Sequence, residues 1–245
     1  PPCSEAIAAM SLFRNAYYWF CLLFAVSIVG FWQSYFSQFG QGTVHVTHHA
    51  HGLSMLLWVA MLITQSWLIR TRRNPMHRRI GKFSFLLAPV VVASAVWVNF
   101  HFMEGREGPF QDGLISIFWF GFFLAIAFAV LYTLAIVHRK EVQLHARYMV
   151  ATSLVFITPG LGRAIGNYVE PLIGWGPTFF QVTLLPLMIG LWLLFLDWRR
   201  KEPLTPFLVF NGLWVFNVLM WIFSPRMSVW HRFAAWSAGV EAGGP

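Results

Sequence analysis

The chain has 245 residues, of which 58% are hydrophobic and only 11% are charged. Soluble domains average about 25% charged residues, so this composition excludes a soluble globular domain and predicts a protein that lies in a lipid bilayer. The formal net charge of +8 comes from basic residues beside apolar stretches. It therefore indicates contact with anionic lipid headgroups and not with nucleic acid.

An α-helix needs about 20 apolar residues to cross the hydrocarbon core of a bilayer. About seven stretches of this length follow one another, at 15–37, 47–70, 80–103, 113–137, 146–168, 177–197 and 204–223. The first apolar run favours a retained anchor helix over a cleaved signal. Because the connections are too short for a soluble domain, we expect one all-α, polytopic membrane helical bundle over 15–223, after an N-terminal tail at 1–14.

The C-terminal segment 224–245 is too short and too polar to form another span. Aromatic residues alternate there with basic residues: Trp230, Phe233, Trp236, Arg226, His231 and Arg232. This pattern is typical of a helix that lies in the membrane interface, although a frayed tail would fit it equally well. We expect an interfacial helix followed by a short tail.

Basic residues gather in three of the predicted connections: Arg70, Arg72, Arg73, Arg78, Arg79 and Lys82; Arg139, Lys140 and Arg147; Arg199, Arg200 and Lys201. The positive-inside rule places these connections in the cytoplasm. We therefore expect a multi-pass protein of the bacterial inner (cytoplasmic) membrane, with its N-terminus in the cytoplasm and its C-terminus outside. The sequence shows no paired Asp or Glu within the spans, which counts against an ion pump.

Four of the nine histidines stand in the run HVTHHAH, where the second predicted span begins: His45, His48, His49 and His51. Imidazole is the commonest protein ligand for transition metals, and ionisable residues at a membrane boundary often mark a functional site. Residues three or four apart share a helix face, so His48 and His51 point the same way, as do His45 and His49. Interfacial histidines with no ligand role are the alternative.

His101 ends the third predicted span on the same side of the membrane, and the short connection makes spans two and three an antiparallel pair. The candidate metal ligands are therefore His48, His49, His51 and His101. Glu104 or Glu107 would supply an oxygen ligand or accept a hydrogen bond from a ligating imidazole.

A second histidine layer lies on the cationic side of the membrane. His77 begins span three, His138 ends span four and His145 begins span five. One layer on each face is what a transmembrane redox protein with two haems, or a protein with two metal sites, would require. We expect His77 and His145 to bind a cofactor, although capping and headgroup contact would also explain them.

Arg163 lies well inside the apolar span 146–168, where a lone guanidinium costs several kcal/mol unless it finds an anion. Glu170, Asp112, a haem propionate or an anionic substrate would satisfy it, and so would snorkelling to the interface. We count Arg163 with the cofactor-binding residues. Pro159, just before it, is expected to kink the span.

The spacing of the histidines distinguishes between known classes of metal and haem site. HVTHH fits one H-x-x-H-H box of the membrane di-iron desaturases, but no second box follows, and no H-E-x-x-H zinc motif occurs. Haem needs one axial histidine from each of two helices, so it tolerates a sparse pattern best. The expected cofactor is haem b or a transition metal, namely iron, copper or zinc.

Two stretches, HHAHGLSMLLWVAMLITQSWLIRTRRNPMHRRIGKFS and HARYMVATSLVFITPGLGRAI, resemble the DUF2306-type bacterial membrane proteins. The similarity covers about residues 45–170. It implies a polytopic helical fold and a set of positions rather than an activity: His49, His77, Arg79, Gly81, His145, Met149 and Arg163. A looser similarity in layout is to cytochrome b561-like haem proteins, whose axial histidines lie within the spans and not at their ends.

Three functions from different classes follow from these patterns. The first is a membrane redox protein that binds haem b or a His-ligated metal and exchanges electrons with quinone. The second is a metal-binding accessory or transport protein. The third is a structural subunit of a larger membrane complex that binds lipids, pigments or neighbouring membrane subunits. The two-layer distribution of histidines favours the first.

Overall fold

A computed structural model describes residues 15–107, 110–174 and 179–240. Within these ranges the regular elements are all helical, which confirms the predicted all-α bundle. The helices are α2 (Ala16–Gly30), α3 (Val46–Arg70), α4 (Asn74–Gly81), α5 (Ser84–Met103), α6 (Asp112–Val137), α7 (Val142–Leu154), α8 (Ile157–Ala164), α9 (Glu170–Ile173), α10 (Phe179–Arg199), α11 (Thr205–Phe223) and α12 (Ser228–Ala238). Shorter turns are η1 (Phe36–Gln38), the π-helix η2 (Ile165–Val169) and η3 (Ser224–Arg226).

Six helical segments are long and apolar enough to cross a membrane: Val46–Arg70, Ser84–Met103, Asp112–Val137, Val142–Ile173, Val182–Arg199 and Thr205–Arg226. They correspond to the last six predicted spans. The predicted first span, 15–37, is different, because its helix α2 ends at Gly30 and has 15 residues within the described part of the chain. After α2, polar side chains form hydrogen bonds with nearby backbone groups. For example, Ser37 Oγ donates to Gln33 O at 3.1 Å.

Two other segments depart from the predicted continuous spans. Span three, predicted from residue 80, begins at Ser84, and His77 lies before it on the separate short helix α4, which starts beside Pro75. Span five is interrupted between Leu154 and Ile157, and its helix then widens into η2. Pro159 lacks the N–H that would bond back to Val155, and the interruption lies at that residue.

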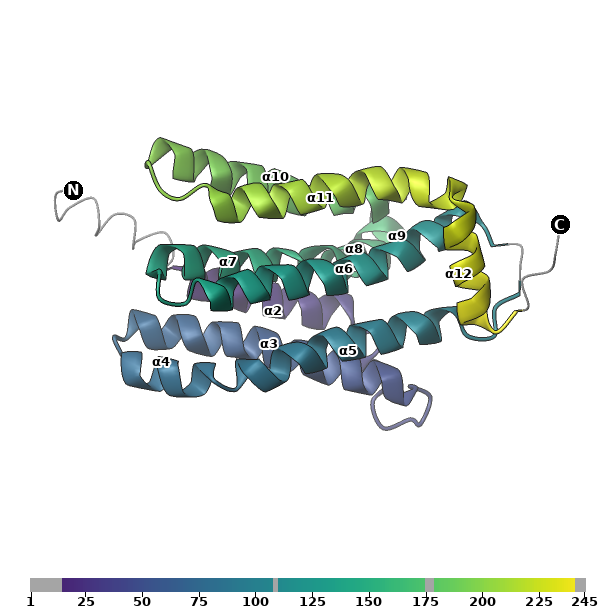
Figure 1. Cartoon of the computed structure of the whole chain (residues 1–245). Helices are drawn as coiled ribbons and strands as arrows, with labels where there is room; N and C mark the ends of the chain where they lie inside the picture. Colours follow the sequence, from purple (N-terminus) through teal and green to yellow (C-terminus); the bar gives the residue numbers. More distant parts are fainter. Residues whose placement is uncertain (1–14, 108–109, 175–178, 241–245) are drawn as a thin grey trace.

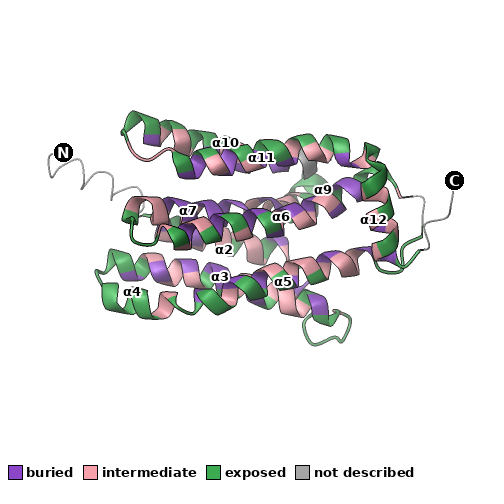
Figure 2. Ribbon diagram, viewed as in Figure 1, coloured by how far each residue is buried: buried purple, intermediate pink, exposed green. Residues whose placement is uncertain are grey.

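The long helices lie side by side along one axis (Figure 1). The α10 and α11 pair packs on one flank, α6, α7 and α8 lie in the middle, and α3 with α5 forms the other flank, while α2 packs against α3 and α8. Trp58, Phe128 and Trp214 are fully buried in the shared apolar core. Figure 2 shows buried residues along α6 and α7, whereas α4 is largely exposed.

The bundle has two chemically different ends. We call one the cationic end; it holds the α3–α4, α6–α7 and α10–α11 connections and their basic residues. The opposite end holds the start of α3, the end of α5 and α12, which lies across the bundle (Figure 1). There Trp230 and Phe233 pack on Phe118 and Phe122 of α6, while Trp236 is 67% exposed. The segment predicted as an interfacial helix is thus a helix seated across the helix ends.

Helix α2 reaches the bundle through a glycine contact that leaves no space for a side chain. A Cβ added to Gly30 would collide with the backbone oxygen of Gly160 in α8, and Asn167 Nδ2 donates to Gly30 O at 3.3 Å. Close backbone approach of this kind is a common way for membrane helices to associate.

We expect Gly30→Ala to destabilise the protein by about 1–3 kcal/mol, because α2 and α8 must separate to admit the methyl group. The matched control is Gly212→Ala in α11, where an added Cβ meets nothing within 4 Å. That change should instead stabilise the helix by about 0.5–1 kcal/mol. Thermal unfolding in detergent, followed by tryptophan fluorescence, measures both. Equal unfolding midpoints for Gly30→Ala and Gly212→Ala would contradict the close contact between Gly30 and Gly160.

Candidate functional site

Two predicted cofactor residues meet at the cationic end. His77 comes from α4 and His145 from α7, and their ring centroids lie 6.5 Å apart with the ring planes at 81°. Helices α4 and α7 are separate elements of the chain, so the packing of α3 to α7 brings the two histidines together. Both side chains are partly buried.

His145 is held in one orientation by the neighbouring helix. Its Nδ1–H donates to the backbone oxygen of Ala135, near the end of α6, at 2.8 Å. A neutral imidazole that donates from Nδ1 carries its lone pair on Nε2. His145 is therefore arranged like a metal-ligating histidine, whose other ring nitrogen usually donates to a carbonyl or carboxylate.

His77 is positioned by Gln65 of α3. With its amide oriented to satisfy both neighbours, Gln65 donates to His77 O at 3.1 Å and accepts from Gly81 N at 3.1 Å, and its nitrogen also contacts His77 Nδ1. Burial lowers the pKa of His77 below its ordinary 6.5, and the nearby His145 lowers it further. The ring is thus held in the neutral form, which is the form that binds metals.

We call this pair the His77–His145 site, and further contacts join the helices that carry it. Ser84 Oγ and Tyr132 Oη are hydrogen-bonded at 2.9 Å between α5 and α6. Tyr132 in turn stands edge-on to Trp58 of α3, with ring centroids 5.4 Å apart. Together with Gln65 and Ala135, these contacts tie α3, α4, α5, α6 and α7 together around the two imidazoles.

A buried ion pair at the same end was not foreseen from the sequence. Arg147 of α7 donates from Nε to Asp197 Oδ2 at 2.8 Å and from Nη2 to Asp197 Oδ1 at 2.9 Å, and both side chains are almost completely buried. Arg147 Nη2 also lies 3.3 Å from Glu202 Oε2, in the α10–α11 connection. The expectation that the spans hold no paired acidic residue is therefore wrong for Asp197. The signal that could have revealed it is a lone carboxylate at the end of an apolar span.

At the opposite end, His101 is the centre of the ring contacts. His45 stacks on it with centroids 3.9 Å apart and planes at 14°, and His48 stands edge-on to it at 5.5 Å. His45 precedes the helix as the N-cap of α3, where its Nδ1 accepts from Thr47 N at 3.4 Å. His101 Nδ1 donates to Glu104 Oε2 at 2.7 Å, which is the hydrogen bond expected for Glu104.

The other two histidines of the run turn toward different partners. His49 Nδ1 is hydrogen-bonded to Tyr35 Oη at 3.2 Å, and its ring also packs edge-on to Phe39. His51 Nδ1 is hydrogen-bonded to Ser94 Oγ of α5 at 3.2 Å. The four predicted metal ligands thus divide among three sets of contacts.

The imidazoles at the opposite end do not converge on one point as they stand. The nitrogen lone pair lies in the ring plane, so two stacked, nearly parallel rings such as His45 and His101 cannot both direct a lone pair at the same ion. Among the described residues, no group of three or more His, Cys, Asp or Glu side chains is arranged to hold a metal ion. A metal role for His48, His49, His51 and His101 therefore stays a prediction.

Arg163 belongs to the opposite end and not to the His77–His145 site. Its guanidinium lies 4.5 Å from the ring centroid of Phe31, which follows the end of α2, and its Nη1 donates to Pro159 O at 3.2 Å. In the part of the chain that the structure describes, no carboxylate forms an ion pair with it, so Glu170 and Asp112 do not fill that role.

The two histidine layers stand far apart. Measured along α3, His51 at one layer and Gln65 at the other are separated by about 21 Å, at 1.5 Å per residue. The predicted two-layer arrangement therefore corresponds to two separate groups of side chains near the two ends of one helix.

Comparison with protein-family models, with curated proteins and with solved structures gives no match to this chain. The resemblance to DUF2306-type proteins stays a prediction.

We expect Asp197→Ala to destabilise the protein by about 3–5 kcal/mol, because it leaves the Arg147 guanidinium buried without its main partner. Replacing both residues, as Arg147→Met with Asp197→Leu, should cost less than the single change, since no charge then stays buried. Glu141→Ala is the control: Glu141 pairs with His138 at the same end, but its side chain is 62% exposed, so the loss should not exceed about 1 kcal/mol. Unfolding midpoints in detergent measure all three. If Asp197→Ala proves as stable as Glu141→Ala, that result would contradict the structural role of the Arg147–Asp197 pair.

Proposed function

We propose that this chain is a membrane redox protein that binds haem b iron, or another transition metal ion, between His77 and His145. The observation that carries the proposal is the 6.5 Å separation of the two ring centroids. Two imidazole nitrogens bound on opposite sides of one ion, each about 2 Å from it, put the ring centroids roughly 6 Å apart. The spacing fits two axial ligands of one ion.

Hydrogen bonds to the two rings support the same role. His145 presents Nε2 because its Nδ1–H is bound to Ala135 O. Gln65 holds α4 at two points beside the His77 ring, since its amide donates to His77 O and accepts from Gly81 N, each at 3.1 Å. Both rings are oriented before any ligand arrives, which reduces the entropy lost on binding.

A haem iron or other redox metal held by His77 and His145 would supply one-electron transfer. The apolar surface of the bundle gives access to a quinone dissolved in the bilayer, which we propose as the electron partner. The positive-inside rule applied to the basic connections supports an orientation in which the cationic end, and with it the His77–His145 site, faces the cytoplasm of a bacterial cell across its inner membrane. The N-terminus is then cytoplasmic and the C-terminus outside.

A metal-binding accessory role is the second candidate, and the hydrogen bond between His101 and Glu104 favours it. A carboxylate that accepts from Nδ1 orients the imidazole and raises its basicity, as at many metal sites. With His48 beside it, His101 would then take copper, zinc or iron at the opposite end without electron transfer.

The test is the visible spectrum and the elemental analysis of purified protein, before and after addition of haemin or of a single metal salt. We expect a reducible Soret band or one tightly bound metal ion per chain. His77→Ala and His145→Ala should each lower bound cofactor at least tenfold, because one remaining imidazole holds the ion poorly. The control is His138→Ala, a partly exposed histidine of the cationic end that pairs with Glu141 at 2.9 Å, and it should retain the cofactor.

His101→Ala separates the two candidates. If it abolishes binding while His77→Ala does not, the accessory role at the opposite end replaces the redox proposal. A protein that binds neither haem nor metal, in either the wild type or the variants, would overturn both.

A further inference from the structure

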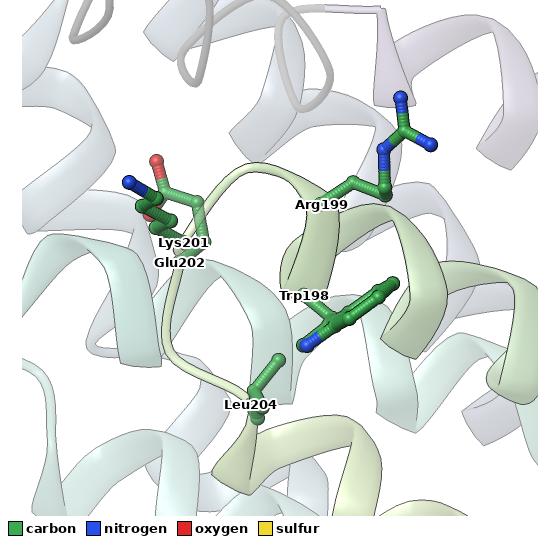
Figure 3. A pocket seen from close by; sticks show the side chains of 5 residues that line it. All are labelled: Trp198, Arg199, Lys201, Glu202 and Leu204. Carbon is green, nitrogen blue, oxygen red and sulfur yellow. The ribbon is translucent and has the colours of Figure 1, made fainter.

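A cleft lies at the cationic end where α10 passes into α11. It encloses about 500 Å³ and is lined by Trp198, Arg199, Lys201, Glu202 and Leu204 (Figure 3). An apolar groove of about 300 Å³ adjoins it and is lined by Leu191, Leu194, Phe195, Trp198, Leu204 and Leu208. Trp198 and Leu204 line both, so the cleft with its charged residues continues into an apolar groove between the two helices.

The charge of the cleft is positive. Its lining includes Arg199 and Lys201, and the carboxylate that accompanies them, Glu202, lies 3.3 Å from the buried guanidinium of Arg147. Figure 3 shows Arg199 on one side of the connection and Lys201 and Glu202 on the other. In the described ranges, no carboxylate forms an ion pair with Arg199 or with Lys201. The cleft therefore favours an anion.

The connection that forms the cleft is held in place from beneath. Glu202 N donates to Asp197 O at 3.0 Å, and the Asp197 carboxylate is fixed by Arg147. The cleft is consequently preformed, which lowers the entropy that a ligand must lose there.

The groove faces outward from the bundle along a membrane-spanning pair. Leu191 is 50% exposed, Leu208 is 53% exposed and Trp198 is 62% exposed. Tryptophan is enriched at the level of lipid headgroups, where its ring is apolar and its N–H is polar. The apolar groove then lies at the depth of acyl chains and the cationic cleft at the depth of phosphates.

We propose that this cleft and groove bind one anionic phospholipid. Its phosphate lies in the cleft that Arg199 and Lys201 line, its glycerol region beside the Trp198 indole, and an acyl chain along Leu191, Leu194 and Leu208. A second copy of this chain would present the same basic rim and repel it, whereas an anionic lipid matches both the charge and the apolar groove. The site is independent of the His77–His145 site.

Native mass spectrometry of the full chain in detergent, titrated with phosphatidylglycerol or with phosphatidylcholine, tests the proposal. We expect phosphatidylglycerol to bind more tightly than phosphatidylcholine. The double variant R199A/K201A should weaken phosphatidylglycerol about 25-fold, since each basic residue near an anionic headgroup contributes about fivefold. The matched control is R139A/K140A, which removes two charges from the same end outside the cleft and should leave the affinity within about twofold.

Leu208→Trp distinguishes a lipid from a free phosphate. Filling the groove should weaken phosphatidylglycerol and leave inorganic phosphate, assayed in parallel, unaffected. Equal affinity of the wild type and R199A/K201A, or equal affinity for both lipids, would overturn the proposal. So would phosphate that competes fully with the lipid while Leu208→Trp has no effect. Thermal unfolding of each variant confirms that it is folded.

Discussion

The absence of water from the hydrocarbon core is the constraint on which this structure depends. A partner within the protein stabilises a polar group inside the bundle, because leaving it unpaired costs several kcal/mol. Asn99 Nδ2 accordingly donates to Phe118 O at 3.1 Å, and Arg147 meets Asp197 with two hydrogen bonds. The ionisable side chains outside such pairs gather near the helix ends, so any chemistry that this chain performs is built there.

This constraint also explains why the His77–His145 site is well ordered. At the end of a helix, backbone oxygens no longer have partners of their own helix and accept hydrogen bonds from side chains. Ala135 O, in the last turn of α6, therefore accepts from His145, and Gln65 near the end of α3 bonds to the short helix α4. Contacts at these helix ends orient two imidazoles that are separated in the sequence by all of α5 and α6.

The sequence predicted the elements that depend on length and polarity, and missed those that depend on local contacts. The spans from α3 onward were foreseen, since a long apolar run has few alternatives to a membrane helix. The early end of α2 was not, because it follows from polar turns after Gly30.

For the site, the two histidine layers could be predicted from the positions of the spans. The pairing of His77 with His145 depends on how the helices pack, which the sequence does not reveal. The same holds for the contacts of His49 with Tyr35 and of His51 with Ser94. Asp197 was overlooked because its partner lies 50 residues away.

The two histidine layers use the same side chain in different ways, and the difference lies in the relation between ring planes. His45 and His101 stack face to face, which excludes water between them but turns their lone pairs into parallel planes. His77 and His145 stand nearly perpendicular at a larger separation, so their ring planes are not parallel. Histidine is more abundant at the opposite end, whereas the ring arrangement that we propose as a ligand site lies at the cationic end. A dense run of imidazoles at a membrane boundary therefore predicts a polar layer, and only the mutual orientation of the rings indicates whether that layer can hold a metal.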